Sequence, residues 1–89
     1  MRTPNFTKQF KKDFKRVQKR GKKLPKLKSV MSQLIDEEVL AGRYRDHVLV
    51  GNYRNRRECH IEPDWLLIYK LDGNEIIFER TGSHADLFK

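Results

Sequence analysis

Apolar residues recur at helical spacing through the first 35 positions of the chain. One set lies on a single face of a helix that Thr7 caps and Gly21 ends: Phe6, Phe10, Phe14 and Val17. A second set has Pro25 in its first turn, and residues 36–42 close it: Leu24, Leu27, Val30 or Met31, and Leu34 or Ile35. The pattern therefore predicts two helices joined as a hairpin.

The apolar period changes after Gly42. Three short segments, RECHI, WLLIYKL and IIFER, are separated by turn signals and predict three strands. Residues 65–69 are apolar on both faces, so they are expected to form the central strand, covered on one side by the helices. The residues before Thr7 are a candidate edge strand, although Pro4 weakens that prediction. We expect residues 1–89 to form one α+β domain, a helical hairpin packed on a small antiparallel sheet of three to four strands.

Positive charge is concentrated near the N-terminus. Residues 1–28 hold 12 of the 20 Lys and Arg residues and one of the 12 acids, which gives a net charge of +11, whereas the rest of the chain carries −3. Like charges four residues apart cost about 0.2 to 0.5 kcal/mol per pair, so the isolated helix gains nothing from them. A solvated face is one interpretation. We favour contact with phosphates, and the candidate RNA-binding residues are Lys11, Lys12, Lys15, Arg16 and Lys19.

Composition bears on the compartment as well. The single Cys59 excludes an internal disulfide, and we expect it to be a small buried residue. The N-terminus lacks an apolar signal segment, and the longest unbroken apolar run, residues 65–69, is far too short to span a bilayer. The expectation is a cytoplasmic protein that does not act in a membrane.

Three histidines lie where predicted strands or loops end. His47 ends RYRDH, His60 precedes a turn and His84 follows RTGS, so antiparallel pairing is able to bring all three to one end of one sheet face. Alternation along the strand puts Glu58 on the same face as His60 and turns Cys59 to the other. Histidines grouped in this way can donate and accept protons near neutral pH.

Other side chains could complete such a site. Pro63 prevents a helical metal pair of His60 and Asp64, and instead places Asp64 after a tight turn, beside His60. Arg80 on the last strand could hold a phosphate. A metal held by the three histidines and Asp64 is a weaker alternative because no compact ligand motif is present. A Ser83 nucleophile is weaker still, since no nucleophile elbow surrounds it.

Three segments, RDHVLVGNY, RECHIEPDWLLIYKL and FERTGSHADLF, resemble in order and spacing the YafQ-like branch of the RelE/ParE superfamily, the toxins of type II toxin–antitoxin systems. The match is close over residues 45–88 and looser over the helices. The resemblance implies a RelE-like fold and a bacterial, ribosome-dependent endoribonuclease that needs no cofactor or metal. It implies that the ribose 2′-hydroxyl attacks the adjacent phosphate of mRNA in the decoding site.

The resemblance also implies roles for individual residues. His47, His60, Asp64 and His84 would form the acid–base set, with Arg80 near the scissile phosphate. The substrate would also meet Phe88, which either stacks on a base or packs on the core, and Glu58, for which the alternative role is only to orient His60. Which residue is the base and which the acid does not follow from the sequence. Trp65 is expected to belong to the core, because it begins the buried strand.

The resemblance names partners too. It implies mRNA on the ribosome, with ribosomal RNA against the basic helix, a cognate antitoxin that covers the basic surface and the site, and operator DNA bound only by the toxin–antitoxin complex. The main alternative is a non-catalytic ribosome- or RNA-binding basic protein, which would bind with a salt dependence but cut nothing. A ParE-like toxin acting on gyrase is weaker, because that branch lacks a comparable set of histidines.

Overall fold

The computed structural model describes residues 1–49 and 55–88; the end of RDHVLVGNY, at positions 50–53, lies outside the described residues. Helices and strands follow one another in this order: β1 (Thr3–Phe6), α1 (Lys8–Lys19), α2 (Leu24–Ile35), the 3₁₀ helix η1 (Gly42–Tyr44), β2 (His47–Val48), β3 (Arg57–Glu62), β4 (Trp65–Asp72), β5 (Glu75–Gly82) and α3 (His84–Leu87).

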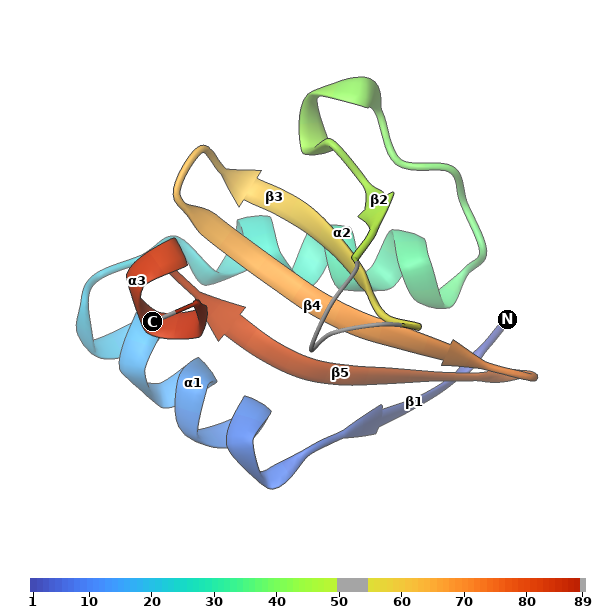
Figure 1. Cartoon of the computed structure of the whole chain (residues 1–89), viewed down its shortest axis with the longest axis horizontal. Coiled ribbons are helices and arrows are strands. Elements are labelled where there is room, and N and C mark those ends of the chain that lie inside the picture. Colours follow the sequence, from blue (N-terminus) through green and yellow to red (C-terminus); the bar gives the residue numbers. More distant parts are fainter. Residues whose placement is uncertain (50–54, 89) are drawn as a thin grey trace.

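The strands form one sheet in the order β1-β5-β4-β3-β2 (Figure 1). The α+β class and the central place of β4 confirm the sequence predictions. The sheet differs from the expected three to four antiparallel strands in two ways. A two-residue β2 pairs with β3 at one edge, and β1 runs parallel to β5 at the other. The sheet is therefore mixed and has five strands.

The edge strand β1 tolerates Pro4 for a simple reason. The amides of Thr3 and Thr7 donate to carbonyls of Asn74 and Phe78, at 2.9 and 3.2 Å, so the odd-numbered residues face β5. Pro4 has no amide hydrogen and occupies a position that faces away from the partner strand.

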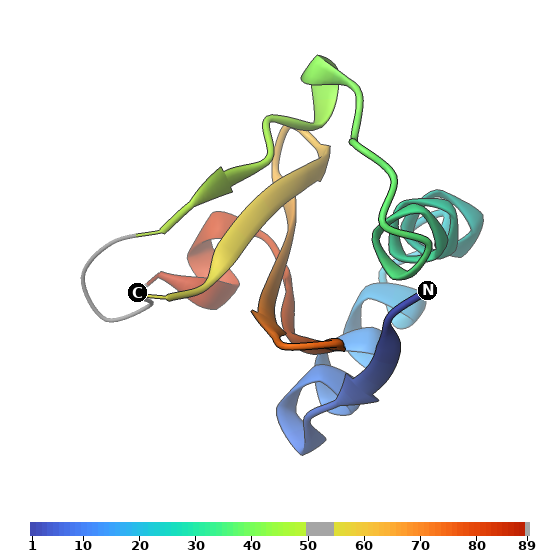
Figure 2. The ribbon, with the colours of Figure 1, turned by 90° about the vertical axis from the view of Figure 1, so that its right-hand side faces the viewer.

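The helical hairpin forms as predicted. Thr7 caps α1, its side chain accepting from the Phe10 amide at 2.9 Å. Gly21 turns the chain with φ +78°, a conformation that costs glycine little. The two helices cover one face of the sheet and α3 lies over the other (Figure 2). The main core forms between the hairpin and the sheet, with Trp65, Tyr69 and Phe78 as its largest fully buried side chains.

Strand register divides the functional residues from the core. Glu58 pairs with Ile68, and His60 pairs with Leu66, so all four side chains point away from the helical hairpin. On that face Leu66 and Ile68 pack with Leu87 of α3 in a second, smaller apolar cluster. Cys59 lies on the opposite face, in the main core, as predicted.

Candidate active site

His47 lies between two hydrogen-bond acceptors. Its Nδ1 is 2.6 Å from the carbonyl oxygen of Arg45, and its Nε2 is 3.0 Å from Oε2 of Glu58. A carbonyl oxygen only accepts, so Nδ1 carries hydrogen. A bare Nε2 would turn a lone pair toward a carboxylate oxygen, which is repulsive. A hydrogen on Nε2 would instead be donated to Glu58, so this contact is favourable only when both ring nitrogens carry hydrogen.

Glu58 is the buried part of this arrangement. Its side chain is 7% exposed, whereas His47 is about half exposed. Oε2 of Glu58 also lies 3.7 Å from Nε2 of His60, so one carboxylate oxygen lies close to two imidazole rings. The expectation that Glu58 orients His60 is incomplete, because its shorter contact is with His47.

Asp64 holds the third histidine. Its Oδ1 accepts from the backbone amide of His84 at 2.9 Å and lies 2.7 Å from Nδ1 of the same residue. These two bonds, the backbone one first, lower the pKa of the Asp64 carboxyl. Nδ1 therefore carries hydrogen, and Nε2 of His84 has no hydrogen-bond partner among residues 1–49 and 55–88. The sequence predicted His60 as the neighbour of Asp64; the residue that Asp64 binds is His84.

The three imidazoles form a row. The ring centroids of His47 and His60 are 6.3 Å apart, and those of His60 and His84 are 5.8 Å apart. This confirms the prediction that pairing of the strands gathers them at one end of one face. Phe88 extends the row, with its ring 6.3 Å from that of His84 and its side chain partly exposed. Phe88 thus lies at the site, while Trp65 is fully buried in the core as expected.

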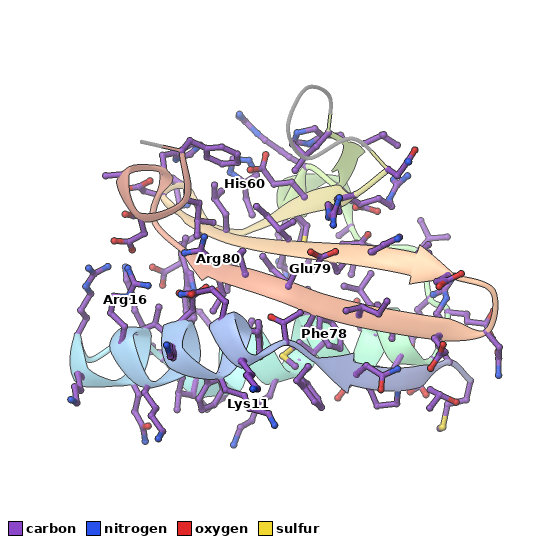
Figure 3. All side chains as sticks on the ribbon, turned by 60° about the horizontal axis from the view of Figure 1, so that its bottom comes forward. Lys11, Arg16, His60, Phe78, Glu79 and Arg80 are labelled. Carbon is purple, nitrogen blue, oxygen red and sulfur yellow. The ribbon has the colours of Figure 1, made fainter. Side chains whose placement is uncertain are left out.

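Arg80 has a partner that the sequence did not reveal. Its Nε donates to Oδ2 of Asp13 at 2.7 Å, and a terminal nitrogen lies 3.4 Å from Oδ1. Asp13 is completely buried and also accepts from the Thr81 amide at 3.2 Å and from Arg16. Figure 3 shows Arg16 on α1 and Arg80 at the end of β5. The guanidinium of Arg80 is therefore held by the carboxylate of Asp13, and a phosphate at the position predicted from sequence would have to share it with that carboxylate.

A second carboxylate ties α1 to α3. Asp86 accepts from Arg20 at 2.6 Å and from the Ser83 amide at 2.9 Å, and Arg16 lies 3.2 Å away. The Arg20 bond is the main reason why the pKa of Asp86 falls below its usual range. Ser83 and Asp86 form a capping box that starts α3 at His84. A β-carbon at Gly82 would lie 2.8 Å from Oδ2 of Asp86, so the close approach requires glycine.

These two aspartates were missed at the sequence level. The SHAD spacing of the capping box was a usable signal for Asp86. Asp13 offered a weaker signal, as the one acid within a strongly basic segment.

The basic helix presents two kinds of cation. Arg16 is held by Asp13 and Asp86, whereas Lys11 points away from the sheet (Figure 3). Four exposed lysines from the predicted RNA-binding set have no ion pair with a carboxylate of the described residues: Lys11, Lys12, Lys15 and Lys19.

A groove of about 810 Å³ opens beside His60, between the first turn of α2, η1 and the end of β3. Within residues 1–49 and 55–88, no group of three or more His, Cys, Asp or Glu side chains is arranged to hold a metal ion. The same residues include no helix long and apolar enough to cross a membrane.

The chain is similar to known proteins over almost its whole length. A family model described as a bacterial toxin of a type II toxin–antitoxin system, YafQ, matches residues 2–89. The mRNA interferase toxin YafQ of Escherichia coli strain K12 is 47% identical over 84 residues, which cover 93% of this chain and 91% of that protein.

Solved structures agree with this. YafQ from E. coli strain BL21(DE3) matches with a TM-score of 0.95 and 44% identity, covering 100% of both chains. A chain of the E. coli DinJ–YafQ complex matches with a TM-score of 0.93 and 46% identity, again over 100% of both.

Proposed function

Because the chain belongs to the YafQ family of bacterial toxins from type II toxin–antitoxin systems, we propose that it cuts mRNA on the ribosome by acid–base chemistry carried by its own side chains. It is an mRNA interferase, an endoribonuclease. One observation carries the proposed mechanism: the row of histidines ends in two different proton environments, Asp64–His84 at one end and His47–Glu58 at the other.

His84 is the proposed general base. Asp64 accepts the Nδ1 hydrogen, which leaves Nε2 as the atom that can take a proton, and the carboxylate stabilises the imidazolium that forms. In the proposed step the 2′-oxygen attacks the neighbouring phosphorus while its proton passes to Nε2 of His84. The bond from phosphorus to the 5′-oxygen then breaks, giving a 2′,3′-cyclic phosphate and a 5′-hydroxyl end.

The acid comes from the other end of the row. His47 has acceptors at both nitrogens and is therefore the histidine best suited to hold a proton for the departing 5′-oxygen. Glu58 holds His47, and His60 lies between the two ends, where it would bind the phosphate oxygens. In-line displacement needs base and acid on opposite sides of phosphorus, and a phosphate bound at His60 would lie between the two ends of the row. Arg80 adds positive charge from the edge of β5.

Ribosomal RNA is the proposed partner of α1. Its exposed lysines repel one another within the helix and gain favourable contacts only when phosphates neutralise them. A cognate antitoxin is also proposed, since the E. coli relative was solved in complex with DinJ. It would cover the basic surface and the site, and the complex would bind operator DNA.

The experiment is single-turnover cleavage of mRNA on programmed ribosomes, mapped by primer extension. His84→Ala and His47→Ala should each slow cleavage by about 10² to 10⁴-fold. An mRNA with sulfur in place of the 5′-bridging oxygen at the cut has a leaving group that needs no acid. It should restore cleavage by His47→Ala and leave His84→Ala slow.

Two outcomes contradict the proposal. If the sulfur-containing mRNA restores cleavage by His84→Ala alone, His84 is the acid and His47 is the base. Salt-sensitive ribosome binding without any cuts by the unmodified protein would favour a non-catalytic binding protein. Ribosome-free RNA should remain intact, and prior dialysis of the toxin against EDTA should leave its activity unchanged.

A further inference from the structure

The groove beside His60 shares this one residue with the row of histidines. Its walls come from η1, the first turn of α2 and the end of β3, and His60 itself lines it. Figure 2 shows η1 next to the end of β3, at one end of the molecule. Its volume of about 810 Å³ lies within the range of roughly 300 to 1,000 Å³ found for small-ligand sites. The space is therefore large enough for a nucleotide that extends away from a phosphate bound at the histidines.

Two arginines in this groove differ from most others in the protein. Neither Arg43 nor Arg45 forms an ion pair with a carboxylate of the described residues. The groove also contains Lys26 and Glu62, but Glu62 is already held by Lys26 at 3.0 Å and by Lys22 at 3.1 Å. Five arginines of the described part of the chain do have carboxylate partners: Arg16, Arg20, Arg56, Arg57 and Arg80. The groove thus retains positive charge for an anionic ligand.

Arg43 also offers a flat surface. Its guanidinium carbon lies 4.9 Å from the centre of the Tyr44 ring, and a terminal nitrogen donates to the Tyr44 hydroxyl at 2.9 Å. Tyr44 in turn packs against the main core. Because the guanidinium is held over a fixed ring, its outer face can receive an unstacked RNA base.

Arg45 links the groove to the row of histidines. It has left-handed backbone angles, φ 49° and ψ 46°, which are rare for a residue other than glycine or asparagine. This conformation directs the carbonyl that binds Nδ1 of His47 at 2.6 Å. Arg45 therefore orients His47 through its backbone. Its guanidinium lines the groove and has no carboxylate partner among residues 1–49 and 55–88.

We propose that this groove binds the mRNA nucleotide adjacent to the scissile phosphate, with Arg45 pairing with its phosphate and the Arg43–Tyr44 pair stacking on its base. The proposal rests on the proposed function, since it takes the histidines as the place of cleavage. It makes Arg43 and Arg45 substrate-binding residues, in addition to the histidines and the lysines of α1.

The test measures single-turnover cleavage on programmed ribosomes as toxin concentration is raised. Arg45→Asn removes the charge and suits the left-handed backbone, and Arg43→Lys keeps the charge but removes the planar surface. Lys28→Asn is the matched control, because Lys28 is exposed on α2 beside the separate groove that Phe14 and Met31 line. Circular dichroism and thermal unfolding of each variant check folding.

Arg45→Asn should raise the half-saturating toxin concentration by at least about tenfold, as expected for one lost charge-assisted hydrogen bond. Arg43→Lys should raise it less, and Lys28→Asn should leave it unchanged. Messages that carry a neutral methylphosphonate in place of the phosphate one nucleotide before or one nucleotide after the scissile phosphate locate the contact and keep the bond to be cut. On the message whose neutral linkage replaces the contacted phosphate, Arg45→Asn and the unmodified protein should behave alike, because the two losses share one contact.

Three results would overturn this assignment. One is the same half-saturating toxin concentration for Arg45→Asn as for Lys28→Asn. Another is a rise in half-saturating concentration for Arg45→Asn, relative to the unmodified protein, that persists on both methylphosphonate messages. The third is normal cleavage by Arg45→Asn with weakened antitoxin binding, which would give the groove to the protein partner. Cleavage by His84→Ala at the unmodified rate would instead refute the proposed chemistry. The half-saturating concentrations of the Arg45 and Arg43 variants would still show whether the groove binds mRNA.

Discussion

Two charged clusters near the end of β5 use their charges in different ways. The arginine–aspartate cluster consists of Asp13, Asp86, Arg16, Arg20 and Arg80, and in it each carboxylate accepts from several donors. The histidine cluster consists of His47, His60, His84, Glu58 and Asp64. There His47 and His84 are about half exposed, and Nε2 of His84 has no partner within the described residues.

The difference separates stability from chemistry. A buried carboxylate such as Asp13 is tolerated only when its donors are complete, so its partners are fixed in the folded state. An imidazole that exchanges protons with RNA needs an atom left open and a neighbour that fixes its tautomer. Mutation of the carboxylates in the first cluster, Asp13 and Asp86, should therefore change mainly the unfolding free energy, and mutations in the second cluster should change mainly the rate of cleavage.

Asp13→Ala is the largest expected effect. It leaves the Thr81 amide and the Arg80 guanidinium without their shared acceptor, and breaking a buried ion pair from one side costs about 3 to 5 kcal/mol. Urea unfolding followed by circular dichroism measures this. His84→Ala serves as the control, and its free energy of unfolding should stay within about 0.5 kcal/mol of that of the unmodified protein. A loss below about 1 kcal/mol for Asp13→Ala would mean that the cluster does not stabilise the fold.

Asp64→Ala should show the opposite behaviour. Removing the acceptor of both His84 bonds frees the imidazole to rotate and to change tautomer, so single-turnover cleavage should fall by about 10²-fold, near 2.7 kcal/mol in activation free energy. The unfolding free energy should hardly change, since Asp64 is well exposed. Unchanged cleavage with reduced stability would make Asp64 a structural cap of α3.

The sequence was most informative where structure depends on near neighbours. Periodicity located α1, α2 and the three long strands, and alternation along β3 put Glu58 and His60 on the face opposite Cys59. It failed where partners come from distant positions. Asp13 is 67 residues from Arg80 along the chain, and no local pattern reveals that its carboxylate is buried.

Two further misses have related causes. Strand β2 contains two residues, which is too short for any alternation to be detected. The partner of Asp64 depends on α3, and a single turn of helix leaves almost no periodic signal. Family resemblance supplied the set of site residues, but the pairing within that set required three-dimensional positions.

Asp86 provides a test by pH. Its pKa is lowered on folding, chiefly by Arg20, so its stabilising contribution is present above the ordinary value of 3.8 and is lost as pH falls toward the folded-state pKa. Asp86→Asn should lower the free energy of unfolding by about 1 to 2 kcal/mol at pH 7, because it removes a helix cap together with partly covered ion pairs. Unfolding curves between pH 7 and pH 3 should show that the difference in unfolding free energy between the variant and the unmodified protein shrinks below pH 4. A constant difference over that range would contradict this origin.

The smallest expected effect compares two adjacent cations on α1. Lys15 and Arg16 each have like charges four residues away on both sides, but only Arg16 contacts Asp13 and Asp86. Lys15→Gln removes two repulsive pairs and should raise the unfolding free energy by about 0.4 to 1 kcal/mol at low salt, less at high salt.

Arg16→Gln removes the same repulsions together with two ion pairs, so it should lower the unfolding free energy instead. Ribosome binding should weaken for Lys15→Gln, because its charge is available to phosphates. Urea unfolding at two salt concentrations and ribosome co-sedimentation measure these effects. If both substitutions change stability in the same direction, the two cations are equivalent, and the distinction between held and available charge on α1 is wrong.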